Sequence, residues 1–444
     1  MLILYSFALM LLLVLGAPWW FFRMATSGKY REGLTERLGF LPRRIRERLD
    51  GKHVVWVHAV SVGEVLAASR LIDEMGSRLP QSSGQRAQDA WRVMISTTTR
   101  TGQDLARERF GADRVFYFPL DLGWAVRAWL RALRPGLLVL VETEFWPRML
   151  AECSRAAIPV AVVNARISDR SWPRYRRFAW LWRPRLRGLA AVLAQTELDA
   201  ERLRELGAAN VRVTGNLKYD VRSPESAMVA SLLRENIAQG ACVLVCGSTL
   251  AGEEGLLLDA LPPGTVTILA PRRPERFAEV AEILKRRGTP WVRRSEWVET
   301  PKPIAAGTVF LLDSIGELGS VYSLADGAFV GGSLVPAGGH NPLEPAQFSV
   351  PVVMGPSYEN FRGIVENLRE HDAIRIVQPA ELKEALSTIL SSTTESRAMG
   401  ARAREVFDRE AGATERAVRA LMELVTARLS NPASQRRARP EARR

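Results

Sequence analysis

Residues 54–64, VVWVHAVSVGE, decide the fold. Their first five positions are mostly β-branched or aromatic, as in a buried strand, and Ser61-Val-Gly-Glu64 then begins a helix. Residues 243–254, VLVCGSTLAGEE, repeat the order of strand, polar turn and helix. Two such beginnings in one chain predict two halves of similar architecture.

Working outward, short β-rich runs alternate with helical stretches from Gly51 onward, a pattern typical of parallel sheets with crossover helices. Sheets of this kind bind ligands at the carboxyl ends of their strands. We therefore expect an α/β fold of two doubly wound, Rossmann-like domains facing a central cleft. The expected strands are 54–58, 93–97, 115–118, 137–142, 160–164, 192–194 and 211–214, then 242–247, 266–270, 309–312, 328–331 and 352–355.

The chain has 444 residues, more than a single hydrophobic core usually serves. The turn-rich stretch 220–226, with Pro224, is the best boundary between two domains. We expect an N-terminal anchor, two domains and a loose basic tail, at 1–22, 23–220, 221–430 and 431–444. Residues 81–90 resemble a polar surface loop.

Residues 1–22 carry no charge and end in an aromatic run at 19–22, where a membrane interface would lie. The basic residues come afterwards, between Arg23 and Arg48, which argues against a secretory signal peptide. By the positive-inside rule the rest of the chain stays cytoplasmic. We expect a single membrane anchor helix here; the alternative is a buried core helix.

The net charge of +13 favours an anionic partner, whether phospholipid, phosphorylated substrate or nucleic acid. Residues 170–187 interleave five aromatic side chains with arginines, which suits either single-stranded nucleic acid or an anionic membrane interface. The apolar N-terminus favours the membrane. Because no nucleic-acid module is recognisable, we expect no nucleic acid as partner.

Several absences bear on the chemistry. The three cysteines and four histidines show no metal-ligand spacing, and no Asp-x-Asp, His-Glu-x-x-His, Walker loop or Gly-x-Ser-x-Gly elbow is present. The cysteines are typical of buried thiols in a reducing compartment. We expect a metal-independent group transfer without a cofactor.

The glycine-rich segment 331–344, GGSLVPAGGHNPLE, follows an expected strand and precedes an expected helix. Its glycines permit close approach to an anion, and the helix start at Pro342 offers unpaired N–H groups. Glu344 is placed to accept bonds from ribose hydroxyls. A plain tight turn is the alternative. The segment Pro271-Arg272-Arg273-Pro274 lies at another expected strand end, so one of its two arginines is suited to bidentate phosphate binding.

Three side chains of the first half end expected strands or motifs. Glu64 fits either a capping box with Ser61 or a general base at the ligand-binding edge. Glu142 and Glu144 follow another strand, where charges are expected to face the ligand. Lys218 is suited to neutralise charge that develops on a phosphate or carboxylate, or is an ordinary surface lysine.

Several motifs together resemble the 3-deoxy-D-manno-octulosonic acid (Kdo) transferases of lipopolysaccharide assembly. They occur in order, from about Tyr30 to beyond Asn360, and only the loop 81–90 and the Arg-rich end depart from the pattern. The motifs are 58–64 HAVSVGE, 142–147 ETEFWP, 164–168 NARIS, 214–220 TGNLKYD, 270–272 APR, 315–317 IGE and 331–344.

The resemblance implies an inverting glycosyltransferase of the GT-B architecture, at the cytoplasmic side of the inner membrane, that moves Kdo from CMP-Kdo to a lipid A precursor. It implies Glu64 as general base, with Glu142 and Lys218 supporting the transition state. Whether Glu142 or Glu144 is the family position stays open. The segments implied to contact CMP are Pro271, Arg272, Ile315, Gly316, Glu317, Asn341, Pro342, Leu343 and Glu344.

Two other functions remain possible at this point. One is a GT-B transferase of envelope synthesis that uses a different nucleotide sugar. The other is a membrane-anchored scaffold that binds a nucleotide without turnover. The number of Kdo residues added is not encoded in any pattern of the sequence.

Overall fold

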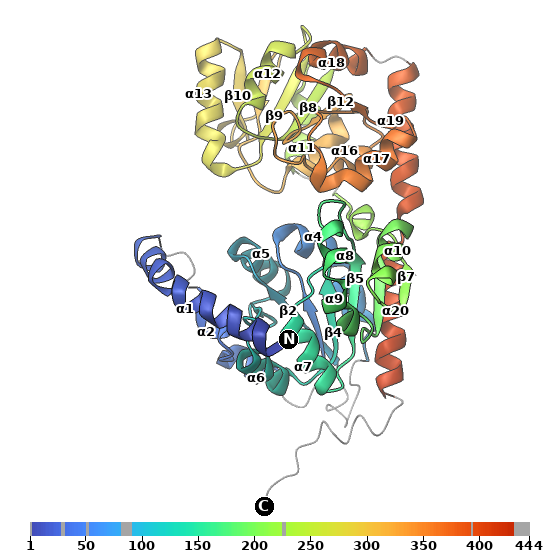
Figure 1. Ribbon diagram of the computed structural model, residues 1–444. Helices are drawn as coiled ribbons and strands as arrows, with labels where there is room; N and C mark the ends of the chain where they lie inside the picture. Colours follow the sequence, from blue (N-terminus) through green and yellow to red (C-terminus); the bar gives the residue numbers. More distant parts are fainter. Residues whose placement is uncertain are drawn as a thin grey trace, which may run out of the picture. The chain divides into compact units, whose positions relative to one another are not determined.

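The computed structural model describes residues 2–27, 32–49, 53–80, 91–223, 228–391 and 394–429. The polar loop expected at 81–90, Pro224 and the tail expected at 431–444 lie outside these ranges. The chain forms two compact units, one of Met1–Val221 with Ala411–Arg444 and one of Arg222–Glu410 (Figure 1). The first boundary falls within one residue of the expected one.

The first unit contains a parallel sheet in the order β3-β2-β1-β4-β5-β6-β7. Chain order runs outward in both directions from the pair β1 and β4, so the loops that follow these two strands leave the same edge and diverge. Such a switch point is where doubly wound sheets bind ligands. The strands are β1 (His53–His58), β2 (Trp91–Thr97), β3 (Val115–Tyr117), β4 (Pro135–Val141), β5 (Val160–Ala165), β6 (Ala191–Ala194) and β7 (Val211–Val213).

Both faces of this sheet are covered, because the side chains of its central strands alternate between two buried cores. On β1, Trp56 packs into one core with Phe116 and Trp129, and Val55 packs into the other with Leu71. The helices are α1 (Leu2–Ser27), α2 (Leu34–Arg37), α3 (Arg43–Arg48), α4 (Val62–Arg78), α5 (Arg100–Phe110), α6 (Gly123–Leu133), α7 (Pro147–Arg155), α8 (Trp172–Arg177), α9 (Ala179–Leu186), α10 (Glu197–Glu205) and the 3-10 turn η2 (Leu217–Asp220).

The second unit has a parallel sheet in the order β10-β11-β9-β8-β12-β13-β14, with its switch point between β8 and β12. The strands are β8 (Val243–Thr249), β9 (Val266–Pro271), β10 (Trp291–Arg293), β11 (Val309–Leu311), β12 (Gly327–Val330), β13 (Val352–Met354) and β14 (Arg375–Ile376). The helices are α11 (Met228–Asn236), α12 (Glu253–Ala260), η3 (Pro274–Arg276), α13 (Phe277–Arg287), α14 (Arg294–Trp297), α15 (Leu318–Val321), η4 (Tyr322–Leu324), α16 (Leu343–Ala346), η5 (Glu359–Phe361), α17 (Arg362–Glu370), η6 (Pro379–Glu381), α18 (Leu382–Leu390) and α19 (Thr394–Glu410).

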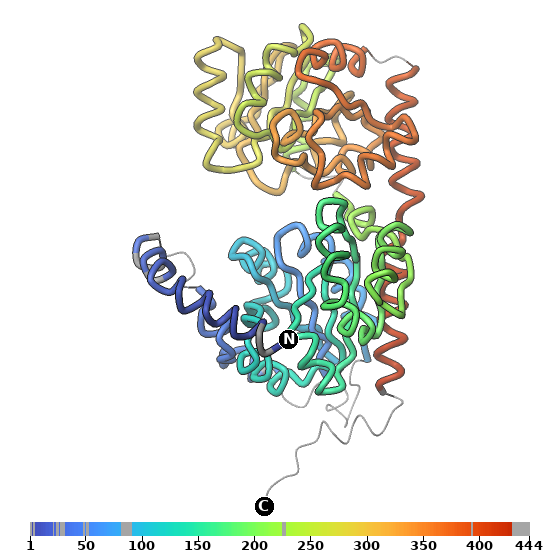
Figure 2. Tube along the Cα trace, in the orientation of Figure 1, coloured from blue at the N-terminus to red at the C-terminus, as the bar shows by residue number. Residues whose placement is uncertain are grey.

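The last helix, α20 (Ala413–Leu429), corrects one expected domain boundary. We expected residues up to 430 in the second domain, whereas α20 belongs to the first unit (Figure 2). Its apolar face, including Ala417 and Leu421, is buried in the same core as α4. The amphipathic pattern of α20 shows that one face is buried but does not specify the partner, which is why the sequence misplaced it.

The apolar N-terminus forms the single helix α1, which continues through Pro18. Phe7, Leu12 and Leu15 are among its large apolar side chains that stay exposed. Among the described residues, no helix combines the length and the apolar character that crossing a membrane requires.

Candidate active site

In the first unit, the switch point brings together the loops that follow β1 and β4. Glu64 lies in the first turn of α4, six residues after the end of β1 at His58, and Glu142 directly follows β4. Both side chains are therefore at the carboxyl edge of adjacent parallel strands, which pair from Val54 to His58 with a register shift between Val54 and Val55. Doubly wound sheets bind their ligands at this edge.

The Glu64 carboxylate is only 8% exposed and is held from one side. The main-chain N–H of Val60 donates to one oxygen at 2.8 Å, and the Ser61 hydroxyl donates to the other at 3.1 Å. Ser61 is the N-cap of α4, but its side chain does not cap the helix. The reciprocal capping box considered for Ser61 and Glu64 is therefore absent, and the bonds orient the carboxylate instead.

The surroundings of Glu64 favour its protonated form. Burial raises its pKa to about 8, and the negative charges of Glu142 and Glu144 act in the same direction, against the hydrogen bonds from Val60 and Ser61. A carboxyl group with a pKa near the working pH is well matched to accepting a proton from a hydroxyl. The geometry and the pKa of Glu64 together fit a general base.

Lys218 lies opposite Glu142. Its Nζ is 3.8 Å from the carboxylate Oε1 of Glu142, and both side chains keep partial access to solvent, at 21% and 32% exposure. Glu142 has a left-handed backbone with φ of 60°, a costly conformation for a residue with a side chain. Such strain is typical of functional sites, so the structure distinguishes Glu142 from an ordinary loop residue.

Glu144 lies close to the same group but makes a different contribution. Burial and the charge of Glu142 raise its pKa, and its own charge acts on Glu64. Between the two acids, the Thr143 hydroxyl bonds to the Arg166 carbonyl and accepts the Arg166 N–H at 3.2 Å. Lys218 forms an ion pair with Glu142. This favours Glu142 as the partner of Lys218.

Two asparagines that the sequence analysis did not single out fix the turn that carries Lys218. Asn164, at the end of β5 with φ of 56°, accepts the Leu217 N–H at 3.0 Å. Asn216 accepts the Lys218 N–H at 3.0 Å and donates to Gln195 at 3.0 Å. Asn164 lies in the NARIS motif, so the sequence marked this segment as part of the family pattern. It did not indicate the bond from Leu217, which is 53 residues away.

In the second unit, Arg272, His340 and Glu344 form a second group at the carboxyl edge of the sheet. Arg272 is exposed, and its charge acts on both of the other side chains. Burial and the charges of Arg272 and Arg273 lower the pKa of His340 to about 4. Burial raises the pKa of Glu344, against the effects of Arg272 and of a hydrogen bond from Asn341. An anion bound at Arg272 would contact a positively charged surface that is partly shielded from solvent.

The glycine-rich segment corrects one expectation. The N–H groups of Gly332, Ser333 and Leu334 donate to the carboxylate of Glu253 at 2.7, 2.9 and 2.9 Å. Glu253 is fully buried and also accepts the Leu250 N–H at 2.8 Å. These amides therefore bind the protein's own carboxylate rather than a ligand phosphate, and Glu253 shapes the loop.

The helix expected after this segment is present but short. It is α16, of four residues, and Pro342 is its N-cap. A helix this short has a weak dipole, so it contributes little to anion binding. Asn341 accepts the Leu343 N–H at 3.1 Å, and Leu343 is buried. Asn341, Pro342 and Leu343 thus hold Glu344 in place.

The remaining donor-site candidates lie in the loop after β11. The Ile315 side chain is 61% exposed, and Gly316 has φ of 91°. Glu317 is already bonded, to the Arg294 guanidinium at 2.5 Å and to the Ser314 hydroxyl. Pro271 ends β9 and is buried. Of this loop, Ile315 and the main chain around it are the parts left accessible to a ligand.

The aromatic and basic stretch 170–187 is only partly a surface. Trp172, Tyr175 and Trp182 pack against the core of the first unit. Phe178, between α8 and α9, and Trp180, on α9, are exposed, at 41% and 64%. Among the described residues, no group of three or more His, Cys, Asp or Glu side chains is arranged to hold a metal ion.

Solved structures of low sequence identity share this architecture. MurG of Acinetobacter baumannii aligns with a TM-score of 0.52 and 14% identity, covering 84% of this chain and 99% of that one. UDP-GlcNAc 2-epimerase of Neisseria meningitidis aligns with a TM-score of 0.54 and 11% identity, covering 84% of this chain and 100% of that one. The C-terminal CMP-Kdo binding domain of WaaA from Acinetobacter baumannii aligns with a TM-score of 0.37 and 36% identity, covering 40% of this chain and 94% of that one. The first two likenesses show the GT-B fold.

Sequence relatives define the family. A family model described as 3-deoxy-D-manno-octulosonic-acid transferase (kdotransferase) matches residues 32–221. The 3-deoxy-D-manno-octulosonic acid transferase of Haemophilus influenzae Rd is 33% identical over 403 residues, covering 88% of this chain and 91% of that one. The one of Bordetella pertussis is 34% identical over 387 residues, covering 83% and 86%.

By its sequence relatives, the protein is thus a glycosyltransferase. The chain belongs to the 3-deoxy-D-manno-octulosonic acid transferase family, whose members transfer Kdo in lipopolysaccharide synthesis. The resemblance drawn from the motifs is confirmed.

Proposed function

We propose that this glycosyltransferase moves Kdo from CMP-Kdo to a lipid A precursor, with inversion at the anomeric carbon. The observation that carries the proposal is the group Glu64, Glu142 and Lys218 at the switch point of the first sheet, with a Glu64 pKa of about 8. The choice of Kdo as the transferred sugar rests on the family relatives, and the proposed catalytic roles rest on the positions of these residues.

The proposed chemistry is one displacement. Glu64 takes the proton from a hydroxyl of the acceptor sugar, the oxygen forms a bond to the anomeric carbon of Kdo, and the bond to CMP breaks on the opposite face. CMP leaves with the bonding electrons. Lys218, with Glu142 as counter-ion, is placed to neutralise negative charge on the Kdo carboxylate or the leaving phosphate.

Donor binding is assigned to the second unit. Arg272 is an exposed cation there, and its charge acts on Glu344. The two side chains therefore offer a phosphate contact and an acceptor for ribose hydroxyls. Ile315 and the main chain around it complete the proposed contacts, and Asn341, Pro342 and Leu343 hold Glu344 in place. A nucleoside monophosphate carries less charge than a diphosphate, so we propose that it leaves without a metal or other cofactor.

We further propose that α1 binds the chain to the cytoplasmic face of the inner membrane. Exposed Phe7, Leu12 and Leu15 on α1 and the following arginines support this. A lipid acceptor and a tethered enzyme share one surface, which raises their effective concentration. Deleting residues 2–22 is expected to move most of the protein to the soluble fraction after lysis and centrifugation. An unchanged membrane fraction would show that another surface binds the membrane.

The proposal is tested with the purified full chain, labelled CMP-Kdo and a lipid A precursor. We expect CMP release and a product heavier by Kdo, by mass spectrometry, and no product from UDP-sugars. Transfer from a UDP-sugar instead would identify another envelope glycosyltransferase. CMP binding without release from CMP-Kdo would identify a scaffold.

A further inference from the structure

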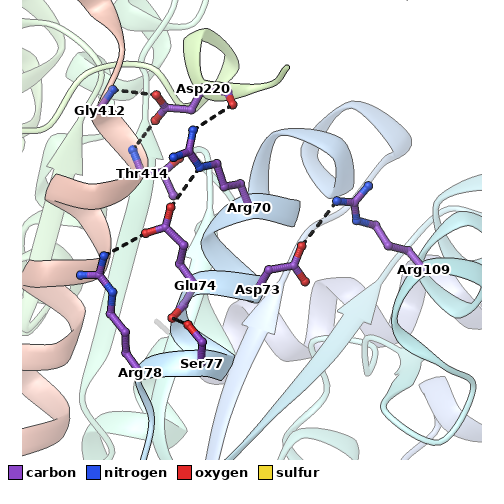
Figure 3. Close-up of polar contacts among 9 residues, drawn as sticks. All are labelled: Arg70, Asp73, Glu74, Ser77, Arg78, Arg109, Asp220, Gly412 and Thr414. Atoms are coloured by element: carbon purple, nitrogen blue, oxygen red, sulfur yellow. Dashed lines mark hydrogen bonds and ion pairs between the residues drawn. The ribbon is translucent and has the colours of Figure 1, made fainter. Parts of the chain in front are cut away.

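Asp220 ends the turn η2, two residues after Lys218, and its side chain is 2% exposed. Its carboxylate is buried. It accepts the N–H of Gly412 at 2.6 Å and the N–H of Thr414 at 2.5 Å, nearly two hundred positions further along the chain (Figure 3). Asp220 therefore joins the turn of Lys218 to the beginning of α20.

The two amides are among the four that a helix start leaves without partners in the helix. Gly412 precedes α20 and Thr414 lies in its first turn, where the helix dipole also favours a carboxylate. A second bond reinforces the junction, because the Arg416 guanidinium of α20 donates to the Thr214 carbonyl at 2.9 Å. The segment 214–220, which carries Lys218, is thus bonded to α20 at both ends.

The same junction reaches the helix of Glu64. Arg70 of α4 donates to the main-chain carbonyl of Asp220 at 3.5 Å and pairs with Glu74 at 3.0 Å, and Glu74 also pairs with Arg78 at 3.2 Å (Figure 3). Beneath these bonds, Leu217 shares one core with apolar side chains of α4 and α20. The element that carries Glu64 and the turn that carries Lys218 are therefore held against one common helix.

A four-residue 3-10 turn has little stability of its own, so its position depends on what it is bonded to. We propose that Asp220 is a positioning residue: by fixing η2 on the start of α20, it keeps the Lys218 ammonium at Glu142. This inference rests on the proposed catalytic role of Lys218. The C-terminal helix, remote in sequence from every motif of the family, then becomes a part of the catalytic apparatus.

The test is a double-mutant cycle in the full-length enzyme, with Asp220→Ala, Lys218→Ala and both together. We expect Asp220→Ala to lower kcat about tenfold to a hundredfold, with the KM for CMP-Kdo nearly unchanged. In the Lys218→Ala background the same change is expected to cost less than about twofold, because the group it positions is already gone.

The pH profile gives a readout that simple destabilisation does not move. When Lys218 leaves Glu142, the carboxylate charge acts more strongly on Glu64 and raises its pKa. The rise of kcat/KM with pH is therefore expected at higher pH in both Asp220→Ala and Lys218→Ala. Asp220→Asn, which keeps one acceptor oxygen, is expected to recover part of the rate and part of the shift.

Glu423→Gln is the matched control. Glu423 lies on α20 and pairs with Arg212 of β7 at 2.9 Å on the exposed side, so it joins α20 to the first unit without touching η2. Its kcat and pH profile should equal those of the parent. Thermal unfolding of each variant identifies any that does not fold, and Asp220→Asn then replaces Asp220→Ala in the cycle.

Two results would overturn the inference while leaving the proposed function intact: full kcat and an unchanged profile in Asp220→Ala, or equal losses from Asp220→Ala with and without Lys218. A Lys218→Ala enzyme with undiminished kcat would instead contradict the proposed role of Lys218 and, with it, this inference.

Discussion

Glu64 and Glu142 are close enough for one charge to alter the proton affinity of the other. Because Glu64 must be ionised to accept a proton, kcat/KM is expected to rise with pH up to about 8 and then level off. Glu142→Gln removes a charge that favours protonated Glu64, so the pKa of Glu64 falls and the rise moves to lower pH. A pH–rate profile of the two enzymes measures this, and an identical midpoint would show that the two acids are not coupled.

The same raised pKa affects stability. In the unfolded chain Glu64 ionises near 4.5, whereas the folded protein retains the proton until about 8. The folded state therefore loses stability as the pH rises between these values, and the whole cost is present above pH 8. Glu64→Gln is neutral throughout, so the variant is expected to unfold a few degrees higher than the parent at pH 9 and with a smaller difference at pH 4. Thermal unfolding at both pH values tests this; equal differences would contradict it.

At the scale of single residues, the sequence singled out the acids and the lysine as candidates because each follows a strand within a recognisable motif. It did not identify Glu253, since the amides that this carboxylate binds are about eighty residues away and any polar residue at a helix start looks similar. Asp220 was within a quoted motif, but nothing local indicated its bond to Thr414. Long-range partners of this kind are set by the tertiary fold.

At the scale of elements, the central strands were predicted because buried parallel strands are continuous apolar runs. The two that the sequence analysis missed, β10 and β14, have three and two residues and are at the edges of their sheet. Each contains arginine, so neither has the apolar pattern of a strand. The start of the helix at Leu343 was expected to favour an anion, but this helix has only four residues.

The glycine-rich loop after β12 gives an element-scale prediction. Glu253→Ala leaves four main-chain N–H groups without an acceptor, at about 1–3 kcal/mol for each one that stays buried, so the loop is expected to rearrange. The second unit should unfold at a lower temperature, and CMP should bind more weakly by calorimetry. Glu275→Gln, an exposed carboxylate of the same unit, serves as control. Unchanged CMP affinity in Glu253→Ala would mean that this loop does not shape the donor site.

At the scale of the whole molecule, the two units repeat one plan: a parallel sheet with a switch point, and functional candidates on the loops that leave it. The likeness of residues 54–64 and 243–254 predicted this repetition. The return of α20 to the first unit was not predictable, because its sequence encodes an apolar face and not the identity of the surface that covers it.

The central claim is that Glu64 is the general base of Kdo transfer. The most direct measurement compares Glu64→Gln with the parent enzyme, for turnover of CMP-Kdo on a lipid A precursor and for CMP binding by calorimetry. Loss of a positioned base predicts a decrease in turnover of about 10²–10⁴-fold with CMP affinity unchanged. Turnover within about threefold of the parent would contradict the claim and leave Glu64 a purely structural residue at the start of α4.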